Sequence, residues 1–207
     1  YSIQIYCDFS GYSDMAIGTA KTFGYDLCKN FDMPYLSQNP TELWQRWHIR
    51  LSTWLRDYLY IPLGGNRKGK VRTKINLMLT MLLGGLWHGA NWQMVFWGAL
   101  HGGALVVHKS FREQSDRRGI HIQRPWLKRV ASIVSVIATY LFTCLCWVFF
   151  RAQSFPDAIT ILSRIVTGAG GIQYYYVFTF LFAGVIVIAT AIGAIQNRRH
   201  GFYPLLD

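Results

Sequence analysis

The sequence predicts an all-α membrane protein with several membrane-spanning helices. Hydrophobic residues make up 52% of its 207 residues, and the 19 glycines are not part of that figure. Soluble domains average about 45–50% apolar residues even with glycine counted. Two uncharged stretches reach the ~20 residues that a hydrocarbon layer requires, and basic residues gather in the loops between apolar segments. Together these observations disfavour an ordinary soluble domain.

The N-terminal segment, residues 1–38, mixes aromatic, small and polar residues, and we expect it to be helical. Glycines at positions 11, 18 and 24 favour close packing against other helices. The chain begins at Tyr1 rather than at a methionine, and it carries no signal-peptide pattern. We therefore expect a single membrane domain over residues 1–207 that is truncated at its N-terminus, the C-terminal portion of a longer protein.

Residues 39–61 predict an amphipathic helix that lies at the membrane interface. Asn39 can cap its N-terminus, Pro40 suits the first helical position, and Glu42 stands three residues after the cap. Tryptophan and leucine recur at helical spacing on one face, and arginine recurs on another. The alternative is a surface helix of a soluble domain, which the neighbouring apolar spans disfavour.

Residues 75–107 predict a broken or re-entrant membrane region. As one helix they would be about 50 Å long, too long for an upright span. Both flanks are basic, so both ends should lie on the same side of the membrane. Gly84, Gly85 and Gly89 interrupt the middle, which predicts two half-depth helices or a hairpin with its turn near His88. Irregular backbone at that depth is tolerated only where it lines a protein cavity or water.

The two uncharged stretches cover residues 130–150 and 174–195, and we predict a transmembrane helix at each. The second begins with three tyrosines and ends just before Arg198 and Arg199, an arrangement typical of a membrane span. A pair of buried core helices is the alternative. Such helices rarely stay uncharged over windows of this length.

The formal net charge of +11 would suggest a nucleic-acid partner in a soluble protein. Here the basic residues form three loop clusters, at residues 67–74, 109–129 and 198–200, and the loop 151–173 is poor in charge. This alternation places the three basic loops in the cytoplasm. Attraction to anionic lipid accounts for the charge, so we expect the lipid bilayer as a partner and no nucleic acid.

The sequence offers no metal, disulfide or nucleotide motif. Its four cysteines form no CxxC pair. Gly64 to Lys70 matches the start of a phosphate-binding loop, but Val71 stands where serine or threonine is required. The acidic residues near the broken region, Asp8, Asp14 and Asp57, are expected to be hydrogen-bond partners, and we expect no bound metal.

Three of the six histidines, His48, His88 and His101, have apolar or aromatic neighbours. Burial keeps an imidazole neutral, which is the state that a general base needs. Local chemistry alone leaves His88 open as a packed core histidine or as a catalytic one. His48 is open as a packed interfacial residue or a second catalytic group. His101 either lines the same cavity or serves helix packing.

Two long motifs resemble the membrane-bound O-acyltransferase (MBOAT) family, in particular its bacterial branch typified by the alginate O-acetyltransferase membrane subunit. They read YCDFSGYSDMAIGTAKTFGYDL at residues 6–27 and NPTELWQRWHIRLSTWLRDYLYIPLGGNRKGKVRTKINLMLTMLLGGLWHGANWQMVFWGALHG at residues 39–102. The resemblance is strong up to about residue 108, and beyond it only the hydropathy agrees. It implies a multi-helix fold around a central membrane cavity.

The resemblance also implies the site residues. The family's characteristic histidine falls on His88 in LWHG, and a second one falls on His48 in WHIRLS, where Arg50 replaces a common serine. His88 and His48 are then the expected catalytic residues, with His88 as the general base. The residues expected to bind substrate are Asn91, Trp87, Trp44 and His101. From their proximity in the sequence rather than from the resemblance, either His48 or Asn91 is expected to stabilise the oxyanion.

The implied reaction is O-acylation, most simply O-acetylation, in a multi-pass protein of the bacterial cytoplasmic (inner) membrane. No cofactor is bound, and an acyl thioester such as acyl-CoA donates from the cytoplasm. The acceptor hydroxyl belongs to an exported polysaccharide or to a partner protein, and periplasmic or extracytoplasmic acetylation proteins are the expected partners.

Two other functions stay open at this point. The first is D-alanyl transfer to teichoic acid, which shares both histidine motifs, although the IPLGGNR loop and the WGALHG ending favour the polysaccharide branch. The second is a non-catalytic membrane scaffold or transporter, because apolar spans and a histidine in a broken helix suit either. Transporters usually carry paired repeats, and this sequence has none.

Overall fold

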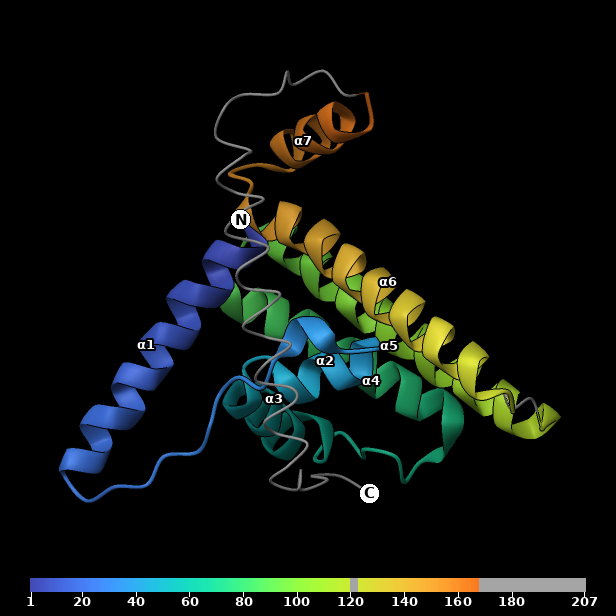
Figure 1. Ribbon diagram of the computed structural model, residues 1–207, viewed down its shortest axis with the longest axis horizontal. Coiled ribbons are helices and arrows are strands. Elements are labelled where there is room, and N and C mark those ends of the chain that lie inside the picture. Colours follow the sequence, from blue (N-terminus) through green and yellow to red (C-terminus); the bar gives the residue numbers. More distant parts are fainter. Residues whose placement is uncertain (120–122, 168–207) are drawn as a thin grey trace. The chain divides into compact units, whose positions relative to one another are not determined.

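The computed structural model describes residues 1–119 and 123–167, and the regular elements in them are helices, with no strand among them. The chain divides into two compact units, residues 1–163 and 164–207, and the candidate site lies in the first. The helices are α1 (Ser2–Thr22), η1 (Pro34–Leu36), α2 (Pro40–Arg46), α3 (Ile49–Leu55), η2 (Arg56–Tyr60), α4 (Gly69–His88), α5 (Trp92–Arg118), α6 (Pro125–Arg151) and α7 (Phe155–Thr167) (Figure 1). The all-α class is therefore confirmed for the described residues.

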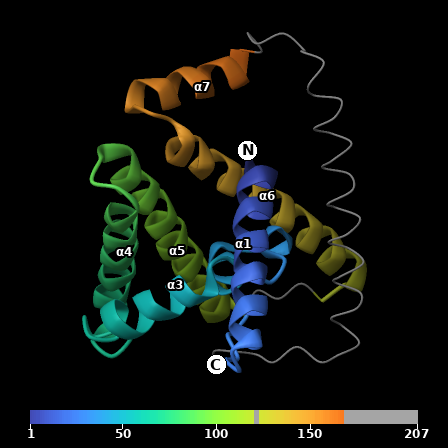
Figure 2. The ribbon, with the colours of Figure 1, turned by 90° about the vertical axis from the view of Figure 1, so that its left-hand side faces the viewer.

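Helices α4 and α5 form an antiparallel hairpin and lie side by side (Figure 2). Glycines make this close approach possible, because a Cβ on Gly85 would collide with the carbonyl oxygen of Met94, and a Cβ on Gly98 would collide with that of Met81. Only three residues, 89–91, separate the helices. The turn thus follows His88 directly, at the place expected from the glycines of the broken region.

The single helix expected over residues 39–61 is divided in the structure. Its start matches the expectation, since the Asn39 side chain accepts a hydrogen bond from the Glu42 amide at 2.9 Å. Helix α2 then ends at Arg46, and α3 begins only at Ile49. His48 between them has a left-handed backbone, with φ of 46°. The π-helical turn η2 completes the segment.

The division has a physical cause in the preceding loop. The Asp32 amide donates to the Arg46 carbonyl oxygen, and the Ile49 amide donates to the Asn30 carbonyl oxygen, both at 2.9 Å. Each bond takes a main-chain group that a continuous helix would have used for itself. The loop after α1 therefore replaces one helical turn and fixes the position of His48. Within residues 1–38, the helix is confined to α1 and the short η1.

Helix α6 contains the predicted span at residues 130–150. Among the described residues, it is the helix that is long and apolar enough to cross a membrane. Large apolar side chains along it, among them Ile133, Val134 and Leu141, are exposed. The predicted span at residues 174–195 and the basic cluster at residues 198–200 lie outside the described residues.

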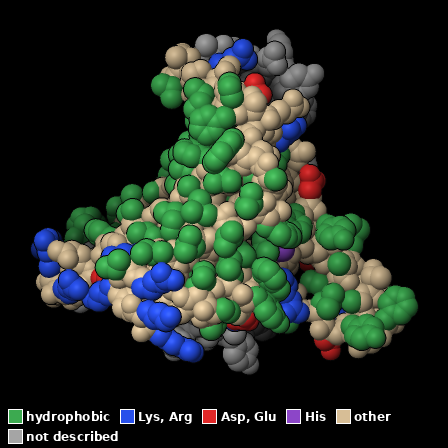
Figure 3. Space-filling model, turned by 180° about the vertical axis from the view of Figure 1, so that it is seen from behind, with side chains coloured by type: hydrophobic (Ala, Val, Ile, Leu, Met, Phe, Trp, Pro, Cys, Tyr) green, Lys and Arg blue, Asp and Glu red, His purple; other side chains and the backbone are tan. Residues whose placement is uncertain are grey.

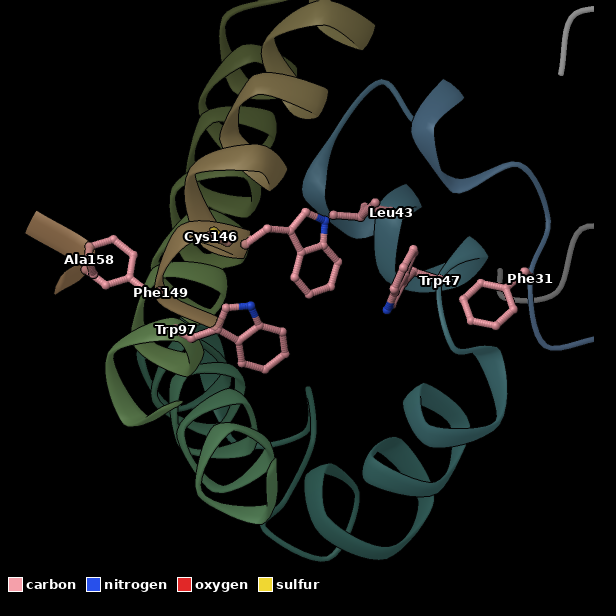
Figure 4. Close-up of a cluster of buried hydrophobic side chains, with 8 residues drawn as sticks. Phe31, Leu43, Trp47, Trp97, Cys146, Phe149 and Ala158 are labelled. Atoms are coloured by element: carbon pink, nitrogen blue, oxygen red, sulfur yellow. The ribbon is translucent and has the colours of Figure 1, made fainter. Parts of the chain in front are cut away.

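A cluster of aromatic side chains joins the elements around the site (Figure 4). The Trp47 ring lies 5.0 Å from Phe31 of the loop after α1 and 5.0 Å from Trp147 of α6, measured between ring centroids. Trp97 of α5 stacks on Trp147 at 6.3 Å. Edge-on and offset aromatic pairs stabilise a core beyond the area that they bury. This cluster connects the loop after α1 and the α2–α3 junction to α5 and α6.

Lysine and arginine side chains gather over the start of α4 and the end of α5 (Figure 3). The two basic clusters at residues 67–74 and 109–129 were separate in the sequence, and the antiparallel hairpin brings parts of both to one end. Lys74 and Glu113 approach to 3.8 Å across that end. This arrangement agrees with the expectation that both flanks of the region lie on one side of a membrane.

Gly85→Ala should destabilise the hairpin, because the new Cβ would meet main-chain atoms of Met94, which cannot turn aside as a side chain can. We expect a loss of about 1–3 kcal/mol, measured as a lower midpoint in a denaturant titration of the purified protein. Gly103→Ala in the same α5 is the matched control, since nothing lies within 4 Å of a Cβ there. Equal midpoints for the two variants would contradict the packing role of Gly85.

Candidate active site

His88 is the last residue of α4, at the turn of the hairpin. Its ring is half-buried and lies edge-on to Trp97 of α5 at 5.1 Å and to Phe150 of α6 at 5.3 Å. Trp87 covers it from the preceding position at 4.8 Å. Among the described residues, no side chain or main-chain group forms a hydrogen bond with the imidazole. Its nitrogens are therefore available to a ligand that enters between these rings.

His48 is held by the loop after α1. Its Nδ1 lies 3.1 Å from Oδ1 of Asn30, and Phe9 of α1 meets the ring edge-on at 4.7 Å. Oδ1 of Asn30 also accepts a hydrogen bond from the Arg50 amide at 3.3 Å. Three elements thus fix this imidazole, namely α1, the loop after it and the start of α3.

The aromatic cluster connects the surroundings of the two predicted catalytic histidines. Phe31 contacts His48 and Trp47, and Phe150 contacts His88 and Trp147. Burial lowers the pKa of His48 to about 4, and the nearby charge of His88 acts in the same direction. His48 is therefore neutral near pH 7 and can accept a proton or a hydrogen bond.

His101 and Trp44 also lie together, deeper in the protein. The Trp44 Nε1–H group donates to His101 Nδ1 at 3.3 Å, and Trp97 contacts the His101 ring at 4.7 Å. His101 is fully buried, and its Nε2 has no hydrogen-bond partner among the described residues. Trp44, Trp97, Trp147 and His101 help to line one small cavity. Trp97 therefore separates His101 from His88.

The remaining predicted substrate-binding residues lie at the turn. The Asn91 side chain caps α5, where its Oδ1 accepts from the Met94 amide at 2.9 Å. This bond leaves the Asn91 amide nitrogen free to donate. Trp87 is 63% exposed and contacts the His88 ring edge-on. Both residues thus lie beside His88 at the turn, whereas Trp44 and His101 contact the other neighbour, Trp97.

Three neighbours of the site were not predicted from the sequence. Trp97 and Phe150 pack against His88, and Asn30 binds His48. Asn30 lies 18 residues from His48 in the chain, and Phe150 lies far beyond the turn, so neither has a periodic relation to its histidine. Trp97 directly precedes Gly98, where the two hairpin helices meet. Its position beside that glycine is the one sequence feature that could have indicated its contact with His88.

The arrangement is suited to proton transfer by histidine. No group of three or more His, Cys, Asp or Glu residues that could hold a metal ion occurs in residues 1–119 and 123–167. Of the acidic residues considered above, Asp57 binds its neighbour Arg56 at 2.7 Å, and Asp8 and Asp14 are exposed. Imidazoles that lie beside indole rings are groups that could transfer a proton to or from a substrate.

Comparison with known proteins gives a consistent family. Residues 1–153 match the sequence profile of the membrane-bound O-acyltransferase (MBOAT) family. The chain is 50% identical to the probable alginate O-acetylase AlgI of Azotobacter vinelandii over 158 residues, which are 76% of this chain and 30% of that protein. The chain thus spans about a third of the length of this relative.

Two further relatives carry other names. The peptidoglycan O-acetyltransferase of Helicobacter pylori is 45% identical over 173 residues, covering 84% of this chain and 31% of that protein. The teichoic acid D-alanyltransferase of Bacillus subtilis is 27% identical over 164 residues, covering 75% of this chain and 40% of that protein. Similarity is therefore greater to the O-acetylating relatives than to this D-alanylating one.

Because His48 is neutral in the folded protein, the free energy of unfolding should depend on pH. The pKa of His48 is about 6.5 in an unfolded chain and about 4 in the folded protein, so the unfolded state binds more protons between these values. The contribution of His48 is present above about pH 6.5 and is lost as the pH falls toward 4. The thermal midpoint of the native protein should therefore fall more between about pH 7 and pH 5 than that of His48→Asn.

Asparagine is the appropriate replacement because it tolerates the left-handed backbone at position 48. The other histidines are present in both proteins, so the difference between the two pH curves reports the loss of the His48 imidazole. A difference that stays constant with pH would show that His48 is not buried in its neutral form.

Proposed function

Because this chain belongs to the membrane-bound O-acyltransferase family, we propose that it carries the catalytic histidines of an enzyme that acylates hydroxyl groups. The enzyme is a multi-pass protein of the bacterial cytoplasmic membrane. Its acyl group comes from a thioester on the cytoplasmic side, and no bound cofactor takes part. The chain spans 30% of the alginate relative, so the activity belongs to the whole protein of which these residues supply the site.

In the proposed reaction, His88 removes the proton of the acceptor hydroxyl as its oxygen attacks the carbonyl carbon of the thioester. A carbon–oxygen bond forms, and the oxyanion then collapses with cleavage of the carbon–sulfur bond. The departing thiolate takes the proton back from the imidazolium. The products are an ester and a thiol, and the neutral imidazole is restored. Base catalysis of this kind typically contributes about 10²–10⁴-fold.

One observation carries this proposal: the imidazole of His88 ends a helix at a turn, surrounded by aromatic rings and without a hydrogen bond from any described residue. A histidine that served packing alone would be expected to have its buried nitrogens satisfied within the protein. At the turn, the ring is half-buried rather than enclosed. Substrate can therefore supply the missing partner.

A polysaccharide hydroxyl is the acceptor that the relatives favour. Those about 50% and 45% identical are named for O-acetylation of alginate and of peptidoglycan. A relative at 27% identity is named for D-alanyl transfer to teichoic acid. We therefore propose acetyl transfer to a glycan, with extracytoplasmic acetylation proteins as partners, and we rank D-alanyl transfer second. Labelled acetyl and D-alanyl donors, offered in parallel to the full-length protein in membranes, distinguish the two reactions.

His88→Ala should abolish acyl transfer while the protein remains folded. We expect a loss of about 10²-fold or more in the transfer of labelled acyl groups by the full-length protein in membranes. His108→Ala is the matched control: His108 lies on α5 and its Nδ1 is 3.2 Å from the Thr41 hydroxyl, remote from the histidine pair in sequence and contacts. Near-normal transfer by His88→Ala would refute the assignment.

A further inference from the structure

We infer that Asn30 is a positioning residue that holds His48 as the Nδ1–H tautomer, so that the unprotonated Nε2 of His48 accepts a hydrogen bond from the acceptor hydroxyl. This inference rests on the proposed acyl transfer and assigns a distinct task to each histidine. His88 removes the proton, and His48 orients the hydroxyl that loses it. Neither the family motif nor the histidine spacing points to Asn30.

The orientation of the Asn30 amide follows from its partners. The Arg50 main-chain amide can only donate, and it lies 3.3 Å from the atom assigned as Oδ1. On the other side, Nδ2 of Asn30 lies 3.1 Å from the hydroxyl oxygen of buried Ser13. The reversed amide would place its NH₂ group against the Arg50 N–H. The oxygen of Asn30 therefore faces α3 and His48.

The same oxygen determines the tautomer of His48. An amide oxygen is an acceptor only, and it has a second lone pair for Nδ1 of His48 at 3.1 Å. Nδ1 must therefore carry the single proton of the neutral imidazole, and Nε2 is left with a lone pair. Among the described residues, Nε2 has neither a hydrogen-bond partner nor complete burial. It is free to bind a donor from substrate.

Asn30 fixes the position of the ring as well as its proton. The Ile49 amide donates to the Asn30 carbonyl oxygen at 2.9 Å, so the main chain and the side chain of one residue both bind the start of α3. His48 itself has the left-handed backbone conformation that this connection requires. Phe9 packs edge-on against the ring at 4.7 Å, and Phe31 stacks at 6.5 Å. Rotation of the imidazole would break several of these contacts at once.

This tautomer restricts what His48 can do. A neutral imidazole with a bare Nε2 accepts a hydrogen bond there and cannot donate one to an oxyanion. A hydroxyl group is the donor that the reaction brings to the site. His101 provides a contrast within the same fold, because Trp44 donates to its Nδ1 and leaves the proton on Nε2. The two histidines are thus fixed in opposite tautomers by their neighbours.

The test compares three substitutions in the full-length protein in membranes. Asn30→Leu removes the acceptor for Nδ1–H with little change in size, and transfer should fall about tenfold or more. Asn30→Asp keeps an acceptor and should retain most of the maximal rate. Its carboxylate favours protonation of His48, so the acid limb of the pH–rate profile should move about one pH unit or more toward higher pH. Among the neighbours of His48, the charge of His88 also affects its pKa. Phe9 and Phe31, which pack against the ring, carry no charge.

Ser13→Ala is the matched control. It removes the other contact of the Asn30 amide and leaves the bond to His48 in place. Its rate and pH profile should stay within about twofold of those of the unmodified protein. A purely structural role of Asn30 would lower the rate without moving the pH profile in Asn30→Asp, and that result would overturn the inference.

A spectroscopic measurement makes the inference independent of the rate. Nitrogen-15 NMR of labelled histidine, with His48 assigned from the His48→Asn spectrum, should report a protonated Nδ1 and a bare Nε2. The opposite tautomer would refute the role of Asn30. Failure of the proposed function looks different: the unmodified protein would transfer no acyl group, or His88→Ala would remain active. An active protein that requires His88 but is indifferent to Asn30→Leu would refute this inference alone.

Discussion

Close contact between the backbones of α4 and α5 is the constraint on which the rest of the site depends. Gly85 and Gly98 let each helix meet main-chain atoms of the other, with no room for a side chain between them. That contact places the turn after His88 and brings Trp97 against its ring. It also carries the basic start of α4 to the basic end of α5. The catalytic proposal and the expected membrane orientation thus share one packing contact.

Sequence patterns predicted the elements whose signals are local. Glycines interrupting an apolar region predicted the turn near His88, and an uncharged stretch predicted a span within α6. The continuous helix over residues 39–61 was wrong at its middle, although its cap at Asn39 was correct. Helical periodicity continues through Trp47 and His48, so it carries no sign of the break. The break depends on main-chain hydrogen bonds between residues 14 and 19 positions apart, Asp32 with Arg46 and Asn30 with Ile49, which no local pattern encodes.

For the candidate site too, the sequence predicted some residues and missed others. The family resemblance identified His88 and His48, and in the structure the charge of His88 and burial both lower the pKa of His48. The resemblance did not indicate Phe150, Trp97 or Asn30. Ring packing and side-chain hydrogen bonds join these residues to the histidines across long distances in the sequence. Asn91 has a visible local task as the cap of α5. Its part in oxyanion binding stays a prediction, as do the roles of Trp44, Trp87 and His101.

The length of α4 has a consequence for the donor. Its 20 residues separate the basic end of the hairpin from His88 by about 30 Å along the helix axis. That rise is close to the thickness of the hydrocarbon layer. A thioester whose anionic head stayed among the lysines and arginines would need a flexible tether of similar reach. If the proposed thioester donor binds in this way, the length of α4 sets the distance that its flexible arm has to cover.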